Sequence, residues 1–175
     1  MRDEDMVVAM NNPDHDGGIY TAMDAWCEDP ANAKARYGPI ASWDTSDITS
    51  MISLFEGKED FNEDISRWNL SNVEDMNCMF DGASSFNGDL SRWEVGQVES
   101  MEMMFNGATS FTGDLSTWEV RQVKSMHGMF YGATSFTGDF SSWEVGLVKV
   151  YGQYVRGCHL VYSPALRDMV DKHGA

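Results

Sequence analysis

The sequence predicts an α/β solenoid, a right-handed stack in which each 25-residue repeat supplies one short parallel strand and one short helix, with helical caps at both ends. The first observation is that the same residue types return every 25 positions through the middle of the 175-residue chain. A fixed period of roughly 20 to 50 residues is typical of stacked repeats, because one repeat cannot bury its apolar face alone. The second observation is that both ends lack this period and carry helix signals instead. The recurring residues that we expect to form the core are Trp43, Trp68, Trp93, Trp118, Trp143, Met76, Met101, Met126, Phe80, Phe105 and Phe130.

The places where the period starts and stops divide the chain into three parts. The first part begins with an acidic arm without apolar periodicity, which would be ordered only if it were held against the cap or another subunit. In the last part, Ser163 and Pro164 start a predicted helix that Gly174 ends. The predicted boundaries are 1–42 for the arm and the N-terminal helical cap, 43–157 for the solenoid, and 158–175 for the C-terminal cap helix.

Two short helices are predicted in the N-terminal cap. From Ile19 to Trp26 the apolar residues are spaced i, i+3, i+4 and i+7, which indicates an amphipathic helix. Asp29 then provides an N-cap and Pro30 a first helical position, and Gly38 ends the second helix. These helices would cover the open end of the core, as terminal units of repeat proteins must.

Each repeat carries its own helix and strand signals. Ser71 and Glu74 have the spacing of a capping box, and Gly82 stands where a left-handed residue ends a helix, so about ten residues up to Gly82 are predicted to be helical. Residues 89–95 alternate between two residue classes and predict a short strand.

The facing of this strand decides which residues a partner would meet. The Trp of each repeat never varies, so we place it inward, which turns the neighbouring aliphatic and acidic residues outward. If the strand bends at Ser91, the aliphatic row turns into the core and the outward face is wholly polar. The residues of the predicted partner face are Ile65, Leu90, Leu115, Phe140, Glu94, Glu119 and Glu144.

The charge of the chain limits its partners. The formal net charge is −16, with 12 basic against 28 acidic residues, which argues against nucleic acid and anionic membranes. A protein partner with a basic rim, or a multi-subunit complex, is the natural complement. The acidic N-terminus has too short an apolar run for a signal peptide or a membrane span, so no direct membrane insertion is expected. Cys27, Cys78 and Cys158 have neither disulfide-framework nor metal-site spacing.

No sequence motif indicates catalysis, so we expect a protein that is not an enzyme and binds no cofactor. The four histidines lie in unrelated contexts, and the chain has no nucleophile elbow, P-loop or HExxH motif. One acidic column needs an explanation, because stacked carboxylates would repel unless they are solvated, bonded to N–H groups of the turn or bridged by cations. We favour the turn bonds over a metal site. The column is Asp64, Asp89, Asp114 and Asp139.

The repeat W-x-V-S-x-V-x-x-M-x-x-M-F-x-G-A-x-S-F-N-x-D-L-S resembles the BspA-like leucine-rich-repeat surface proteins, also called the mycoplasma lipoprotein-associated repeat family. The resemblance covers about Trp43 to Gly157, and the entry unit is similar to the form found in unicellular algae. It implies a leucine-rich-repeat-like solenoid and non-enzymatic binding or adhesion, often at cell surfaces. The chain departs from the pattern at the N-cap slot, which holds Gly96 and Arg121, and at the loop Asn, which is replaced by Thr112 and Thr137.

Two function classes follow. The first, which we favour, is a protein–protein interaction or scaffold module, including an accessory structural subunit of a larger assembly. The alternative is a secreted or cell-surface adhesin-type module, with cation or glycan binding less favoured. The compartment follows from the resemblance as the cell surface, or as an organelle such as a plastid if a leader has been removed.

Overall fold

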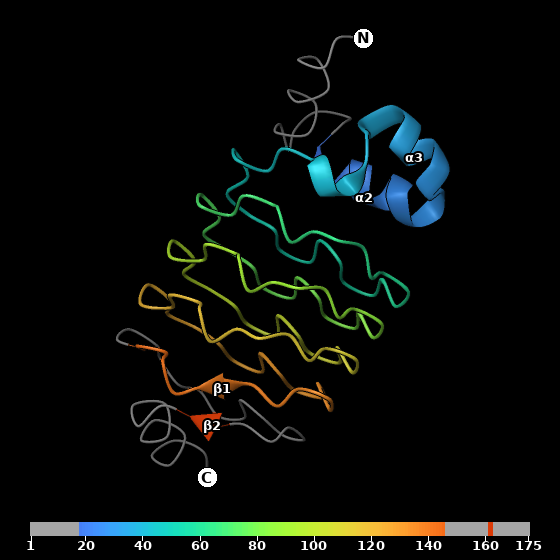
Figure 1. Ribbon diagram of the computed structural model, residues 1–175. Coiled ribbons are helices and arrows are strands. Elements are labelled where there is room, and N and C mark those ends of the chain that lie inside the picture. The colour runs from blue at the N-terminus through green and yellow to red at the C-terminus, as the bar shows by residue number, and fades with distance from the viewer. Residues whose placement is uncertain (1–17, 146–160, 163–175) are drawn as a thin grey trace.

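The computed structural model describes residues 18–145 and 161–162 of the chain (Figure 1). Two helices lie at one end, and below them the chain runs in successive turns that lie one above another. We call each 25-residue turn a coil. The predicted arm and C-terminal cap helix lie outside the described residues. The coils are coil 1 (residues 43–67), coil 2 (68–92), coil 3 (93–117) and coil 4 (118–142).

Both predicted helices of the N-terminal cap form. Helix α2 spans Ile19–Glu28, and helix α3 spans Pro30–Tyr37. Asp29 caps α3 as expected, since its Oδ1 accepts hydrogen bonds from the N–H groups of Ala31 and Asn32, each 3.1 Å long. Gly38 follows α3 with a φ of 77°, a left-handed value that favours glycine. The buried face of α2 is the predicted one, Ile19, Ala22, Met23 and Trp26.

The cap joins coil 1 through side chains. After the short 3₁₀ helix η1 (Ile40–Ser42), the chain enters Trp43, and the ring of Trp26 meets it edge-on with ring centroids 5.8 Å apart. Lys58 of coil 1 forms an ion pair with Asp24 of α2, with a nitrogen-to-oxygen distance of 2.7 Å. The cap therefore closes the end of the aromatic core without a backbone ladder to the coil beneath it.

Adjacent coils are joined by backbone hydrogen bonds that repeat with the sequence period. Isolated parallel bridges connect Ser50, Asp75, Ser100 and Ser125 in turn. In each of coils 1 to 3, starting one residue after the bridge, every second N–H group over four donors donates to a carbonyl of the next coil. The donors are residues 51, 53, 55 and 57, then 76, 78, 80 and 82, then 101, 103, 105 and 107. Coil stacking is thus set by backbone register as well as by side-chain packing.

The helix predicted in each repeat is not present among residues 43–145. Those residues form turns instead, because alternate N–H groups, such as that of Cys78, are committed to the next coil and cannot donate within a helix. Cys78 also has a left-handed φ of 55°, and the equivalent Gly128 has a φ of 63°. The predicted capping box does not form either, since the Glu74 N–H donates to Thr49 O of the preceding coil at 2.8 Å and not to Ser71.

The predicted strand is reduced in the same way. Residues 89–95 contain a turn, and the equivalent strand appears once, as β1 (Asp139–Phe140). It pairs in parallel with β2 (Val161–Tyr162), in a two-stranded sheet. Within residues 43–138, regular sheet is therefore replaced by isolated bridges and turns.

The aromatic columns fill the inside of the coils. All of the predicted core residues are buried, none more than 5% exposed. The phenylalanine rings stack from coil to coil, with Phe80 and Phe105 centroids 5.4 Å apart and their planes 5° from parallel. The indole N–H of Trp93 donates to Ile65 O at 3.1 Å, and that of Trp118 to Leu90 O at 3.0 Å. Tryptophan therefore faces inward, as predicted, and each of these indoles is bonded to a carbonyl 28 residues earlier in the chain.

Candidate functional site

The aliphatic row predicted to face a partner lies in the core instead. A turn at Ser91 and Arg92 separates Leu90 from Trp93, and the Trp93 N–H donates to Leu90 O at 3.1 Å. Because the chain turns between them, residues three apart both point inward, whereas an alternating strand would have turned them to opposite faces. The alternative bend at Ser91 describes the observed arrangement. The residues removed from the proposed partner face are Ile65, Leu90, Leu115 and Phe140, none more than 3% exposed.

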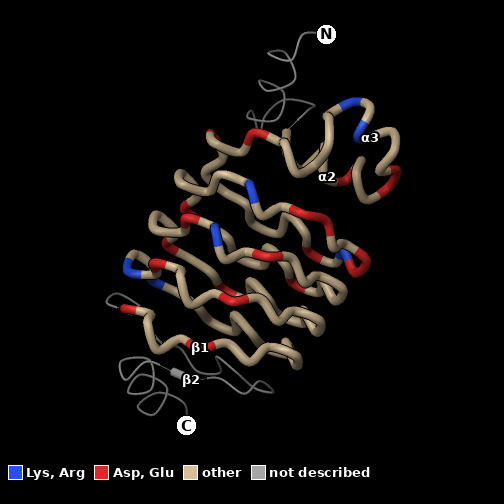
Figure 2. Tube along the Cα trace, viewed as in Figure 1, with Lys and Arg blue, Asp and Glu red and all other residues tan. Residues whose placement is uncertain are grey.

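The acidic part of the predicted partner face does point outward. Glu94, Glu119 and Glu144 are exposed, and each stands between a buried Trp and the following apolar residue. We call these three residues the Glu row. Adjacent coils lie about 4.8 Å apart where their backbones pair, so the Glu row concentrates negative charge on one face. Figure 2 shows acidic residues on every coil, with few basic ones among them.

A hollow lies beside the Glu row, where coil 3 lacks a side chain. The cavity has a volume of about 380 Å³, and Glu94 and Glu119 supply its carboxylates. Gly96 lines it, at the position that holds Ser71 in coil 2 and Arg121 in coil 4. Arg121 instead pairs with Glu144, with a nitrogen-to-oxygen distance of 2.9 Å. The hollow is therefore acidic, and the third Glu of the row is partly neutralised.

Each carboxylate of the Asp column accepts a hydrogen bond within its own turn, from the residue two positions on. The carboxylate of Asp64 accepts a hydrogen bond from the Ser66 N–H at 3.0 Å, and Asp89, Asp114 and Asp139 accept equivalent bonds at 2.8–3.0 Å. The hydroxyl and N–H of the serine two residues on hold the pKa values of Asp64 and Asp89 below their usual range. Among the described residues, no group of three or more His, Cys, Asp or Glu is placed to hold a metal ion.

An amide ladder along one corner of the coils was not foreseen from the sequence. Asn62 Oδ1 accepts the Asn87 N–H at 2.9 Å, and Asn87 Oδ1 accepts the Thr112 N–H at 2.8 Å and its hydroxyl at 3.0 Å. The signal was present, because polar residues at this exposed position keep the 25-residue period. An exposed polar residue that repeats in register needs a reason, and here the reason is a bond between coils.

A second polar connection had no periodic signal. Asn77 Oδ1 accepts the Ser100 hydroxyl at 2.6 Å and the Glu102 N–H at 2.7 Å. Between coils 3 and 4, the Ser125 hydroxyl donates to Glu102 Oε1 at 2.5 Å. The equivalent positions carry different residue types from coil to coil, so the sequence could not show that they share a role.

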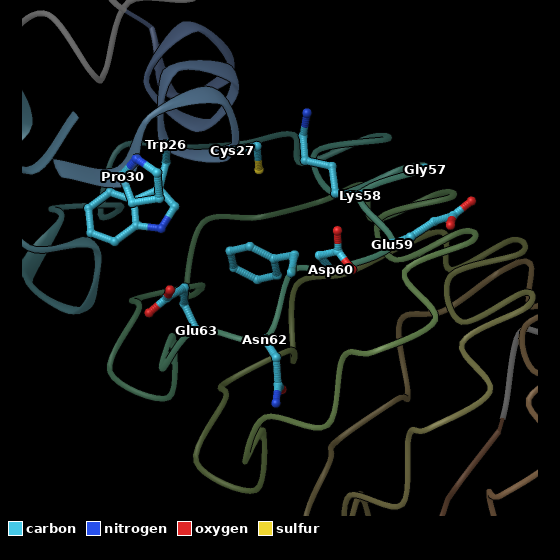
Figure 3. Close-up of a pocket in the computed structure, with 10 residues that line it drawn as sticks. Trp26, Cys27, Pro30, Gly57, Lys58, Glu59, Asp60, Asn62 and Glu63 are labelled. Atoms are coloured by element: carbon cyan, nitrogen blue, oxygen red, sulfur yellow. The ribbon is translucent and has the colours of Figure 1, made fainter. Parts of the chain in front are cut away.

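A pocket lies where the cap meets coil 1. Its volume is about 490 Å³, and Figure 3 shows it between the end of α2 and the outer corner of coil 1. From the cap, Trp26, Cys27 and Pro30 line the pocket, and from coil 1, Asp60 and Glu63 are among its residues. We call this the cap pocket. The pocket is lined by the aromatic ring of Trp26 on the cap side and by the acidic residues Asp60 and Glu63 on the side of coil 1.

The regular coils, their stacked aromatic columns and their polar outer rows define the chain as a repeat protein. Residues 23–143 match the family described as "Mycoplasma protein of unknown function, DUF285". This match covers more than half of the chain, so the chain belongs to that family. No curated protein and no solved structure matches the chain. Among the helices of the described residues, none has the length and apolar character needed to cross a membrane.

Proposed function

We propose that this chain is a non-enzymatic binding module of the solenoid class, which docks a basic protein surface on the Glu row and serves as a scaffold or accessory subunit in a larger assembly. The observation that carries the proposal is the repetition of Glu94, Glu119 and Glu144 at one outward position of consecutive coils. A stack with a continuous aromatic core holds these carboxylates at fixed spacing, so little conformational freedom is lost when a partner binds.

The hollow at Gly96 supports an anchor within this surface. Glu94 and Glu119 line it, and a lysine or arginine side chain entering between them would gain two charge-assisted contacts. Arginine fits best, since its planar group offers several N–H donors to two carboxylates at once. The remaining acids of the face would act at longer range and raise the rate of association.

The test compares two variants of equal charge. The triple change Glu94→Gln, Glu119→Gln and Glu144→Gln removes the Glu row, and the control changes Glu28, Glu56 and Glu74 to Gln on other parts of the chain. Proteins captured from native extract at low salt would be identified, and their affinity for each variant measured. We expect the Glu-row variant to bind about tenfold more weakly at low salt and the control to match the wild type. Equal weakening by both variants, or binding unaffected by salt, would reject the docking surface.

We further propose that the family kinship extends to BspA-like surface proteins in their algal form, which supports the alternative of a secreted or cell-surface adhesin-type module. The support is the 25-residue motif together with the entry unit around Trp26, which the family match includes from residue 23 onward. In this version the Glu row would face a partner outside the cell. Labelling intact cells with an antibody to the protein tests it, and a signal that appears only after permeabilisation would reject it.

A further inference from the structure

In coils 2 and 3, the corner that carries the amide ladder has a donor edge facing the preceding coil. In coil 2 the Ser85 N–H donates to Glu59 O at 3.0 Å, and two residues on, the Asn87 N–H donates to Asn62 Oδ1 at 2.9 Å. In coil 3 the equivalent Ser110 N–H donates to a coil 2 carbonyl at 3.1 Å. N–H groups at i and i+2 along one edge are the pattern by which an exposed strand edge takes up another strand.

Coil 1 has the same donor edge without a coil before it. By the repeat register its donors are the N–H groups of Asp60 and Asn62, and the residues one period earlier lie in α3. The carbonyls of a helix point along its axis, so α3 presents no extended carbonyl edge of the kind that a coil presents. Among the described residues neither N–H has a hydrogen-bond acceptor. The cap pocket occupies the space where a preceding coil would lie, and Asp60 and Asn62 line it.

A third donor in the pocket wall is also unused. Trp26 is 7% exposed, and its indole nitrogen has no hydrogen-bond partner among the described residues. By contrast, the Trp68 indole donates to Ile40 O at 3.0 Å, as its equivalents do in later coils. A buried N–H without an acceptor costs stability, so an acceptor that reached Trp26 would be bound favourably. Figure 3 shows the Trp26 indole on the cap side of the pocket, across from Glu63.

The charge of the pocket selects among possible occupants. Glu59, Asp60 and Glu63 line it, and its one lining cation, Lys58, already pairs with Asp24 at 2.7 Å. A phosphate or another anion would be repelled. A second copy of this chain, with its net charge of −16, is likewise disfavoured.

We propose that the cap pocket binds an extended, basic segment of a partner protein, which adds to coil 1 in the place of the missing coil. Its backbone carbonyl accepts the Asp60 N–H, and an asparagine or glutamine side chain accepts the Asn62 N–H, as Asn62 does for Asn87 one coil on. Lysine or arginine residues on either side of the amide meet Glu59 and Glu63. This site is separate from the Glu row and does not depend on it.

The test uses a short synthetic peptide with one central asparagine, threonine and valine alternating beside it, and lysine at both ends. Calorimetry would measure its affinity, and amide NMR shifts would locate it. We expect shifts at Asp60 and Asn62, and a loss of about fivefold in affinity or more when the central asparagine is replaced by leucine. Peptide shifts confined to the Glu row would overturn the pocket while supporting the other surface.

Two matched variants separate binding from folding. Trp26→Phe loses part of a buried ring but no hydrogen bond, so we expect a smaller fall in melting temperature than for Trp68→Phe, and a peptide affinity about fivefold lower. Trp68→Phe removes a satisfied indole bond, so we expect a lower melting temperature and unchanged peptide affinity. Equal peptide affinity for the wild type and Trp26→Phe would overturn the proposal, and so would self-association that Trp26→Phe abolishes, because the occupant would then be a second copy.

Discussion

The junction between coils and the junction between the cap and coil 1 are sealed in different ways. Between coils, backbone donors at every second residue meet carbonyls of the neighbouring coil, and the indole N–H groups of Trp68, Trp93 and Trp118 each reach a carbonyl 28 residues earlier in the chain. At the cap, two helices satisfy their own amides, and the contact is made by side chains. Tyr20 of α2 shows the substitution directly, since its hydroxyl donates to Ile52 O at 2.9 Å.

The carbonyl of Ile52 is the one that a preceding coil would have used. Its equivalents, Asn77 O and Glu102 O, accept the N–H groups of Ser53 and Cys78, at 2.9 Å and 2.8 Å. One hydroxyl therefore replaces one backbone donor, and the donor edge at Asp60 is left open. The comparison shows that coil-to-coil contacts are set by the backbone and tolerate changes of outer side chains, whereas the cap contact depends on a few particular side chains.

The largest effect is expected inside the coil stack. Phe105 is fully buried and stacks on Phe80 and Phe130, with ring centroids 5.4 Å and 5.5 Å away. Phe105→Ala should lower the free energy of unfolding by about 3–5 kcal/mol, because it opens a cavity in the middle of the column. Urea unfolding followed by circular dichroism measures this loss. A loss below about 1 kcal/mol would mean that the coils do not depend on a continuous aromatic column.

A smaller loss is expected when a polar link between coils is removed. Asn77→Ala leaves the Glu102 N–H and the Ser100 hydroxyl without their acceptor, which should cost about 1–3 kcal/mol. Asn72→Ala is the matched control, since Asn72 is exposed and donates one bond, to Ser46 O at 2.7 Å. Urea midpoints that fell equally for both variants would show that the two part-buried donors bonded to Asn77 contribute no more than the single exposed bond of Asn72.

At the cap, the Tyr20 hydroxyl, which takes the place of a backbone donor, is expected to contribute less to the free energy of unfolding. Tyr20→Phe deletes the hydroxyl that meets Ile52 O, and the loss of this part-exposed bond should cost about 1 kcal/mol. The hydrogen exchange of coil 1 amides should quicken more than that of coil 3 amides, since the cap protects only the first coil. Exchange that quickened evenly along the chain would indicate that the cap and the coils unfold as one unit.

The sequence predicted the period, the cap helices and the buried columns, because each depends on residue type at a fixed spacing. The predicted helix and strand of each repeat were wrong, because backbone conformation and hydrogen bonding between coils decide these segments. The segment that ends at Phe80 has helical apolar spacing, but left-handed Cys78 and the commitment of alternate N–H groups to the next coil prevent a helix. The alternating pattern of residues 89–95 predicted a strand with Leu90 and Trp93 on opposite faces, but the turn between them places both side chains inward.

The two candidate sites also differ in how far the sequence predicts them, because one depends on a pattern within the repeat and the other does not. The Glu row was found because its facing follows from an invariant Trp beside it, as Glu94 follows Trp93. The cap pocket was not, because it depends on how α3 lies against the corner of coil 1, and no pattern within one repeat encodes a contact between a cap and a coil.

The smallest effect concerns the turns of the Asp column, where acid and amide can be compared directly. Asn69 makes the same turn bond as Asp89, to the Ser71 N–H at 3.0 Å, so Asp89→Asn should keep the turn, while Asp89→Ala should cost up to about 1 kcal/mol. Hydrogen bonds from Ser91 lower the pKa of Asp89 below its usual 3.8 in the folded protein. Its contribution to stability is therefore fully present above the unfolded pKa and is lost as the pH falls through the lower folded pKa.

Comparison of the two proteins across pH isolates this contribution. Asp89→Asn carries an amide that does not titrate, so any stability advantage of the wild type should shrink as the pH falls below about 3.8, the ordinary pKa that the group has when unfolded. Melting temperatures of both proteins between about pH 2 and pH 6 measure this difference, and the background effect of the other acids cancels. A difference that stayed constant down to the lowest pH would show that the turn draws nothing from the charge of Asp89, and that the column is held by its hydrogen-bond geometry alone.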